Sequence, residues 1–248
     1  MFRLSGLEGA ELSRIEKTWS ELTTPHKHRL LEDLDDLARS TTLVDFESIY
    51  KLGIEDSATN IQHMAIRALW DSEDPGLIRP LLNALTHGEE ETAALAAEAL
   101  GRYLLLAELG KISQARGAEI LKTLLNLYQK DDTPESVQQA AIRSLGYATD
   151  ERIPQWIDSA YRKGGTAWTA AALGAMGHSS DMRWEAQVLD HLDSPDSMIR
   201  LEAIRAAGES GTEEAEELLL LYLKDDDDEI RHAASWALSE VGEKDARG

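Results

Sequence analysis

The chain has 248 residues and a formal net charge of −21, with 46 Asp and Glu against 25 Lys and Arg. Such an acidic surface disfavours nucleic acid and anionic lipid as partners and favours a basic or dipolar partner. Cysteine is absent, which excludes disulfides, thiolate metal sites and a cysteine nucleophile. The sequence shows neither a membrane-length apolar run nor a signal peptide at its start, so it predicts a cytoplasmic protein that does not enter the membrane.

The first predicted pair of helices spans residues 8–22 and 25–39. Apolar residues in the first of these helices follow each other at steps of three and four, which makes it amphipathic. Thr24 and Pro25 are a capping residue and a first-turn proline, so they mark the start of the second helix. We expect residues 1–40 to form the N-terminal capping pair of the fold.

The rest of the chain alternates between two kinds of predicted helix, a first and a second helix in each pair. The first helices are predicted at 43–52, 75–86, 117–130, 152–162, 182–192 and 212–224. The second helices begin near residues 57, 89, 134, 165, 195 and 226. Glycines and proline-containing steps fall near the predicted helix ends, as is typical of helix boundaries.

The second helix of each pair carries a repeated pattern. Residues 199–211, IRLEAIRAAGESG, recur 31 residues later as residues 230–242, IRHAASWALSEVG. The copies can be aligned at the residue that follows the second alanine of the pattern. In successive copies this residue is at position 38, 69, 100, 145, 173, 207 and 238. The steps are 31, 31, 45, 28, 34 and 31, so residues 101–117 are predicted to be an insertion within the third repeat.

A helical stripe that recurs at this period cannot be buried by one helix alone and must pack against its neighbours. The pattern therefore predicts an all-α fold. We expect a right-handed α-solenoid of about seven antiparallel helix pairs, which forms a single domain over residues 1–248.

The repeated pattern resembles the HEAT-like repeats of the phycobilisome-lyase type. The matching residues are Asp196, Ile199, Arg200, Ala203, Ala206 and Gly208, and again Asp227, Ile230, Arg231, Ala234, Ala237 and Leu238. Other copies depart from the pattern at the arginine position, which holds Gln62, Ala93, Gln138 and Thr166. The resemblance implies that the second helices line a concave groove, and it implies an architecture rather than an activity.

The side of each second helix opposite the apolar stripe is then expected to face this groove. The residues predicted to bind a partner there are His63, Arg67, Trp70, Glu98, Arg102, Arg143, Tyr147, Trp168, Arg205, His232 and Trp236. Arginine and aromatic residues are the usual anchors of protein interfaces. The alternative is that each arginine pairs with an acid such as Glu98, Glu202 or Glu209 and forms a solvated face.

No catalytic, metal-binding or cofactor-binding motif stands out. Glu229 and His232 have the Glu-x-x-His spacing of di-iron bundles, but the sequence holds no second copy. The acidic run 225–229 lacks the alternating ligands and central glycine of a calcium loop. Deoxyhypusine hydroxylases are also built from HEAT-like repeats and carry His-Glu dipeptides, which this sequence lacks. We expect no catalytic residue, no metal and no cofactor.

The leading hypothesis is a non-enzymatic scaffold that binds a protein or peptide partner in its concave groove. One alternative is a bilin lyase or isomerase subunit, which rests on the repeat type alone. A second is an alkylpurine DNA glycosylase, which the acidic charge disfavours. The residues that resemble those of its groove are Arg67, Trp70, Asp71, Arg143 and Trp168. We also expect self-association through the C-terminal end, because no extra capping helix follows the last pair.

Overall fold

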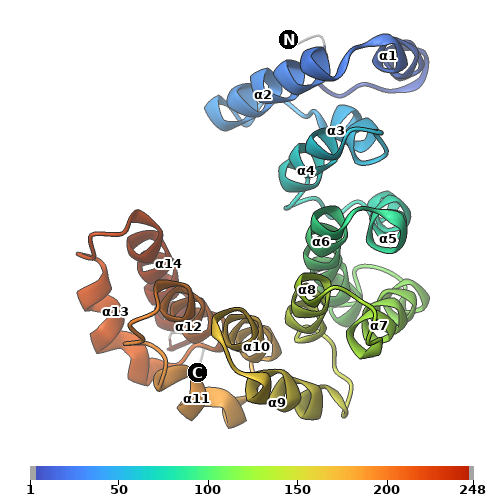
Figure 1. Ribbon diagram of the computed structural model, residues 1–248. Coiled ribbons are helices and arrows are strands. Elements are labelled where there is room, and N and C mark those ends of the chain that lie inside the picture. Colours follow the sequence, from blue (N-terminus) through green and yellow to red (C-terminus); the bar gives the residue numbers. More distant parts are fainter. Residues whose placement is uncertain (1–3, 246–248) are drawn as a thin grey trace. The chain divides into compact units, whose positions relative to one another are not determined.

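The computed structural model describes residues 4–245 and contains fourteen α-helices and no β-strand in that part of the chain (Figure 1). The all-α prediction is therefore confirmed. The helices group into two compact units, Met1–Leu100 and Gly101–Gly248, called unit 1 and unit 2 below. The single domain over residues 1–248 and the handedness of the solenoid stay predictions.

Unit 1 is built from helix pairs near the predicted positions. Its helices are α1 (Gly9–Glu21), α2 (Thr24–Ser40), α3 (Glu47–Ile54), α4 (Thr59–Ala68), α5 (Ile78–His87) and the first part of α6 (Glu90–Glu108). A 3₁₀ turn at Pro75–Leu77 leads into α5, and Asp74 accepts a hydrogen bond from the N–H of Gly76 at its start. Packing joins α1 to α3, α2 to α4, and α3 to both α4 and α5.

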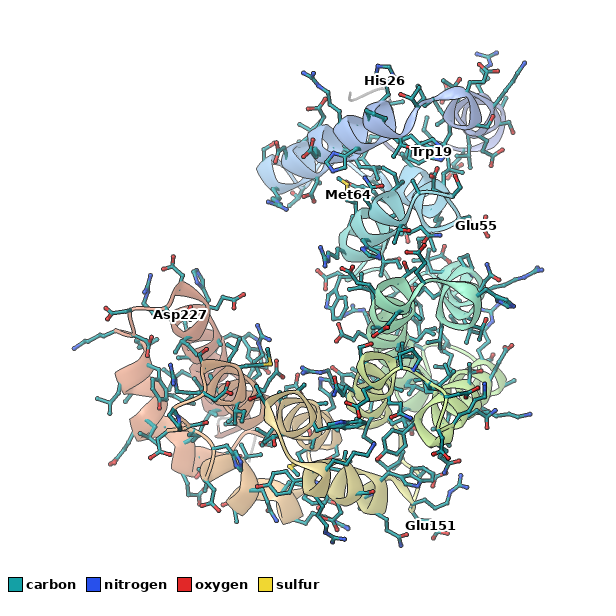
Figure 2. All side chains as sticks on the ribbon, viewed as in Figure 1. Trp19, His26, Glu55, Met64, Glu151 and Asp227 are labelled. Carbon is teal, nitrogen blue, oxygen red and sulfur yellow. The ribbon has the colours of Figure 1, made fainter. Side chains whose placement is uncertain are left out.

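Asp56 connects three helices of unit 1 through its buried carboxylate. Lys27 of α2 donates to Asp56 Oδ2 at 2.6 Å, and Trp19 Nε1 of α1, labelled in Figure 2, donates to the same oxygen at 2.8 Å. The N–H of Ala58, just before α4, donates to Oδ1 at 3.0 Å. Burial alone would raise the pKa of Asp56, but these hydrogen bonds outweigh it and hold the pKa below its ordinary value.

Unit 2 consists of four helix pairs that follow the end of α6. They are α7 (Gln114–Gln129) with α8 (Glu135–Leu145), α9 (Ile153–Lys163) with α10 (Thr166–Ser179), α11 (Glu185–Leu189) with α12 (Ser197–Ser210), and α13 (Glu216–Tyr222) with α14 (Asp228–Asp245). Each odd-numbered helix packs on the even-numbered helix that follows it, and α8, α10, α12 and α14 pack on one another in that order. Within unit 2, the even-numbered helices form an inner row and the odd-numbered helices an outer row (Figure 1).

The predicted insertion at 101–117 is mostly helical and packed. The helix α6 continues to Glu108, and a short connection leads to α7 at Gln114. Tyr103 and Leu106 on the extension are buried, and Glu108 accepts hydrogen bonds from the backbone and side chain of Thr149. The extra residues of the third repeat therefore extend the core of unit 2.

Glycines allow the inner helices of unit 2 to approach one another closely. Gly177 lies so near α12 that an added Cβ would be 2.6 Å from Ala206 Cα, and at Gly208 the distance to Ala237 Cα on α14 would be 2.7 Å. Contacts of this kind pair Gly146 with Ala175, Gly177 with Ala206, and Gly208 with Ala237. Each member is 31 residues from its counterpart in the next repeat.

This spacing corrects the predicted register of the fifth repeat. Because Gly146, Gly177 and Gly208 are equivalent, the counterpart of Leu145 is Met176 rather than Leu173. The steps of 28 and 34 are then both 31 residues. The prediction was wrong because α10 is buried on all sides from residue 168 to 177, so its sequence lacks the contrast between polar and apolar faces that fixes a register.

In four repeats, the side chain at the arginine position donates a hydrogen bond to a backbone carbonyl of the loop before its own helix. Arg200 Nη1 donates to the carbonyl of Ser194 at 2.7 Å, and Arg231 donates to that of Asp225 at 2.6 Å. In the divergent repeats, Gln62 donates to the carbonyl of Asp56 at 2.8 Å, and Gln138 to that of Lys130 at 3.0 Å. Glutamine therefore replaces arginine in this role, because one N–H donor is enough to pair with a loop carbonyl.

Candidate functional site

The exposed side of the inner row in unit 2, on α8, α10, α12 and α14, is called the inner surface. Arg143, Tyr147, Arg205, His232 and Trp236, which were predicted to bind a partner, belong to these helices or to the turn after α8. The structure connects these residues through two clusters and one pocket.

Arg143 and Arg205 share one buried carboxylate. Arg143 Nη1 of α8 lies 2.5 Å from Glu202 Oε2 of α12, and Arg205 Nη1 lies 3.0 Å from Glu202 Oε1. The Arg143 side chain passes α10 at Gly174, where an added Cβ would be 3.1 Å from the guanidinium. The Glu202 side chain is only 7% exposed, so Arg143 serves mainly to neutralise it. For these two arginines, the structure shows the ion pairing that the sequence left as the alternative.

Tyr147, His178 and Glu209 form a second cluster, with one residue from each of three successive repeats. The rings of Tyr147 and His178 stack with centroids 3.9 Å apart and an interplanar angle of 13°. His178 Nδ1 donates to the carbonyl of Arg143 at 2.9 Å, and its Nε2 lies 3.3 Å from Glu209 Oε1. Burial raises the pKa of Tyr147 and the charge of Glu209 raises it further, so its hydroxyl stays protonated at neutral pH.

His178 was missed in the sequence because the register of the fifth repeat was set wrongly. In the corrected register, Tyr147, His178 and Glu209 are equivalent positions 31 residues apart. That spacing is the signal that could have found the cluster.

A pocket of about 400 Å³ lies between α12 and α14 and brings together three of the predicted residues. It is lined by Arg205, Asp228, Glu229, His232, Ala233 and Trp236. Trp236 is 41% exposed, and its ring packs so closely on Gly208 that a Cβ there would lie 2.9 Å from Cζ3. His232 Nδ1 donates to the carbonyl of Asp228 at 2.6 Å, which leaves Nε2 as an acceptor in the neutral ring. The pocket can hold an apolar side chain beside charged groups.

Trp168 does not have the exposure expected of a groove residue. It is only 6% exposed, its ring meets Tyr128 edge-on at 6.5 Å, and Lys163 Nζ lies 3.5 Å from the ring centroid. Burial lowers the pKa of Lys163. Trp168 is therefore a packing residue. Its predicted place on an open surface was wrong because α10 is buried on all sides, so its sequence does not distinguish an exposed face from a buried one.

The predicted residues of unit 1 differ in exposure. His63 is half-buried, with Nε2 2.8 Å from Thr92 Oγ1 and Nδ1 3.4 Å from Glu91 Oε1. Arg67 is exposed and lines a cavity of about 200 Å³ beside α2. Trp70, just after α4, is 47% exposed.

The two predicted residues on α6 lie on either side of the division between the units. Glu98 belongs to unit 1 and Arg102 to unit 2, and both are half-buried. The prediction that Arg67, Arg102, Arg143 and Arg205 share one groove involves both units and stays a prediction.

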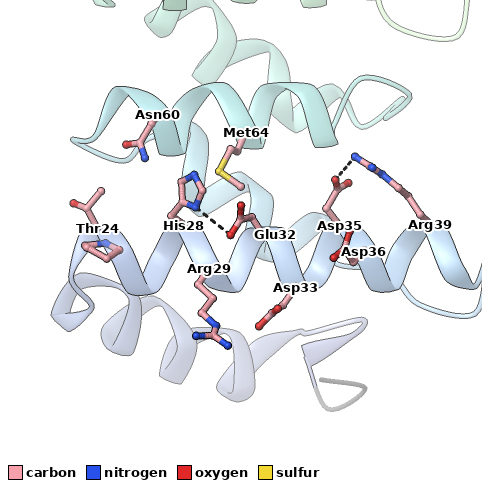
Figure 3. Close-up of a pocket in the computed structure, with 11 residues that line it drawn as sticks. Thr24, His28, Arg29, Glu32, Asp33, Asp35, Asp36, Arg39, Asn60 and Met64 are labelled. Atoms are coloured by element: carbon pink, nitrogen blue, oxygen red, sulfur yellow. Dashed lines mark hydrogen bonds and ion pairs between the residues drawn. The ribbon is translucent and has the colours of Figure 1, made fainter. Parts of the chain in front are cut away.

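Unit 1 also holds an acidic cleft of about 900 Å³ between α2 and α4 (Figure 3). Its charged lining comes from α2, where His28 Nδ1 lies 3.3 Å from Glu32 and Arg39 lies 2.5 Å from Asp35. Asp33 and Asp36 add further negative charge to the lining. Coulomb attraction makes this cleft favourable for cationic groups.

Among the residues that the structure describes, His, Asp and Glu side chains form no group of three that could hold a metal ion. None of the helices in residues 4–245 has the length and apolar character needed to cross a membrane.

Comparisons with known proteins give the following similarities. A family model described as HEAT repeats matches residues 185–247. The structure of human deoxyhypusine hydroxylase in complex with glycerol is 15% identical, with 94% of this chain and 96% of that chain covered and a TM-score of 0.43. A designed armadillo repeat protein is 17% identical, with 77% and 98% covered and a TM-score of 0.38. No curated protein matches the sequence.

The match to HEAT repeats covers α11–α14, which include both copies of the clearest sequence pattern. The phycobilisome-lyase type of repeat stays a prediction. The match shows HEAT repeats in residues 185–247, and the helix pairs of both units give the rest of the described chain the arrangement of a helical repeat protein.

Proposed function

We propose that the protein is a non-enzymatic scaffold that binds a protein or peptide partner on the inner surface of unit 2. The observation that carries the proposal is the pocket between α12 and α14, where Trp236 is 41% exposed beside Arg205 and His232. Tryptophan and arginine are enriched among the residues that dominate binding energy at protein interfaces.

The surroundings of the pocket support a rigid binding surface. Arg205 is held by Glu202, and Trp236 is held against Gly208, so both side chains are partly ordered before a partner arrives. Ordering these side chains in advance lowers the entropy that binding would otherwise cost. Such a surface can bind tightly without any reactive group.

The Arg143 ion pair and the Tyr147–His178–Glu209 cluster have a different role. Arg143 is 24% exposed and neutralises Glu202, so its loss would disturb the packing of α8, α10 and α12. Variants of Arg143 are therefore unsuitable for testing partner binding. Trp236 and His232 offer more exposed positions.

The test is capture of partners by the tagged full-length chain from an extract of its own organism, followed by affinity measurement with the captured protein. We expect Trp236→Ala to weaken binding by about 30-fold, which corresponds to about 2 kcal/mol for an interface anchor. His232→Ala should weaken it less. Met182→Ala is the matched control, because this side chain is 62% exposed in the turn that leads into the outer helix α11.

Circular dichroism and thermal melting of each variant separate loss of binding from loss of fold. Unchanged affinity in Trp236→Ala, or an equal loss in Met182→Ala, would show that the partner binds elsewhere. A basic partner is expected because the chain carries a net charge of −21.

A further inference from the structure

The last outer helix of unit 2, α13, and the residue after it expose three large apolar side chains. Leu220, Leu221 and Leu223 are 50%, 67% and 39% exposed, and they are called the leucine patch. Single exposed leucines are common, whereas several exposed within four residues mark a candidate interaction site. The patch lies on the outer row, so it is distinct from the pocket at Trp236.

Comparison with the preceding repeat shows what kind of element covers such a patch. Leu192, which is 31 residues before Leu223, is 0% exposed, and Leu189 is more buried than its counterpart Leu220. The hydroxyl of Tyr222 on α13 donates to the carbonyl of Leu192 at 2.6 Å, so the next outer helix lies against this position. The equivalent residue after α13, Leu223, is 39% exposed instead.

One leucine of the patch stands where the preceding repeat has a polar residue. The counterpart of Leu221 in the preceding repeat is Asp190, which is exposed to solvent there. Leu221 therefore places an apolar side chain where the repeat itself does not require one. Burial of Leu221 needs a partner that reaches beyond the usual contact between repeats.

Acidic residues flank the patch on both sides in the sequence. Glu216 and Glu217 are exposed one turn before its first two leucines, and the acidic run 225–229, which includes the labelled Asp227, follows it (Figure 2). Lys224 is the basic side chain in this stretch. A second copy of the chain would bring like charges together, which costs free energy, whereas a basic partner would be attracted.

We propose that the leucine patch docks an amphipathic helix of another protein, with an apolar stripe of leucine-like residues flanked by Lys and Arg. The docked helix would lie along the side of α13 that carries Leu220 and Leu221. Its apolar stripe would cover these two leucines, and its basic flanks would face Glu216 and Glu217.

The test uses the full chain and a fluorescently labelled helical peptide with a leucine stripe and lysine flanks, followed by fluorescence anisotropy. We expect the peptide to bind, and an otherwise identical peptide with glutamate in place of lysine not to bind. Leu221→Ser should weaken binding about tenfold, or about 1.4 kcal/mol. Raising the salt from about 0.05 M to about 0.5 M should also weaken it, because screening reduces the attraction between the charged flanks.

Two control variants make the outcome specific. Leu43→Ser alters a leucine that is 87% exposed in unit 1 and should bind the peptide as the wild type does. His232→Ala should also leave peptide binding unchanged. Peptide binding that is lost in His232→Ala but kept in Leu221→Ser would place the peptide on the inner surface, which overturns this proposal and leaves the proposed function standing.

Other results would overturn the proposal directly. Equal binding of the glutamate peptide, or unchanged binding in Leu221→Ser, would show that the patch and its acidic rim do not select a basic helix. A dimer that light scattering detects in the wild type and not in Leu221→Ser would show that a second copy covers the patch instead.

Discussion

Replacing Asp56 with alanine tests the buried ion pair of unit 1. The Lys27 and Asp56 side chains are only 11% and 2% exposed, and the two charged atoms lie 2.6 Å apart. Removing the carboxylate leaves the ammonium of Lys27 and the indole N–H of Trp19 without their shared acceptor. Loss of one partner from a buried pair costs about 3–5 kcal/mol, so unit 1 should lose most of its stability.

The assay is hydrogen exchange followed by mass spectrometry, because it reports the opening of each unit separately. In Asp56→Ala, peptides from α1–α4 should exchange much faster, while peptides from α10–α14 should exchange as in the wild type. Asp35→Asn is the matched control. Asp35 pairs with Arg39 at the surface, where the side chains are 38% and 75% exposed, and an exposed pair contributes less than about 1 kcal/mol. Equal effects of the two variants would refute the argument from burial.

The same residue predicts how unit 1 responds to pH. The pKa of Asp56 is lower in the folded protein than in the unfolded chain, so its contribution to stability is fully present above the unfolded value of about 4. That contribution is lost as the pH falls through the folded value. Protection of α1–α4 should therefore fall on acidification in the wild type and fall less steeply in Asp56→Asn.

Three further predictions concern unit 2. Gly177→Ala should cost about 1–3 kcal/mol in urea denaturation, because its Cβ would lie 2.6 Å from Ala206 Cα, whereas Gly242→Ala, with nothing within 4 Å, should be close to neutral. Glu202→Gln should speed hydrogen exchange in α8 and α12, because the carboxylate that pairs with Arg143 and Arg205 is lost; unchanged exchange would argue against this ion pair. Met176→Ala should cost about 2–5 kcal/mol, because this residue is 1% exposed.

Most of the fold could be predicted because most helices have one polar and one apolar face. The pairs from α1–α2 to α13–α14 lie close to their predicted ranges, and the copies at 199–211 and 230–242 correspond to α12 and α14. The register failed only where this contrast is missing, in the Ala-rich α10. There the spacing of Gly146, Gly177 and Gly208 holds the information instead.

The candidate site could be predicted less well, because side-chain pairing depends on the space left by intervening residues. Arg143 reaches Glu202, 59 positions away, because Gly174 leaves room for its side chain. The helical periodicity of the repeat places Arg143 on the side of its helix opposite the apolar stripe. It does not show whether a carboxylate of another repeat is within reach of the guanidinium. Arg205 and Trp236 could be placed on one face because they occupy the same position in two successive repeats, 31 residues apart.

Site-specific photo-crosslinking tests whether a partner binds at the pocket between α12 and α14. A photoreactive amino acid is placed at His232 in one variant and at Met182 in another, and each is irradiated with the captured partner. We expect a covalent adduct from position 232 and none from position 182, if the partner binds at this pocket. Adducts from both positions alike, or from position 182 alone, would contradict it.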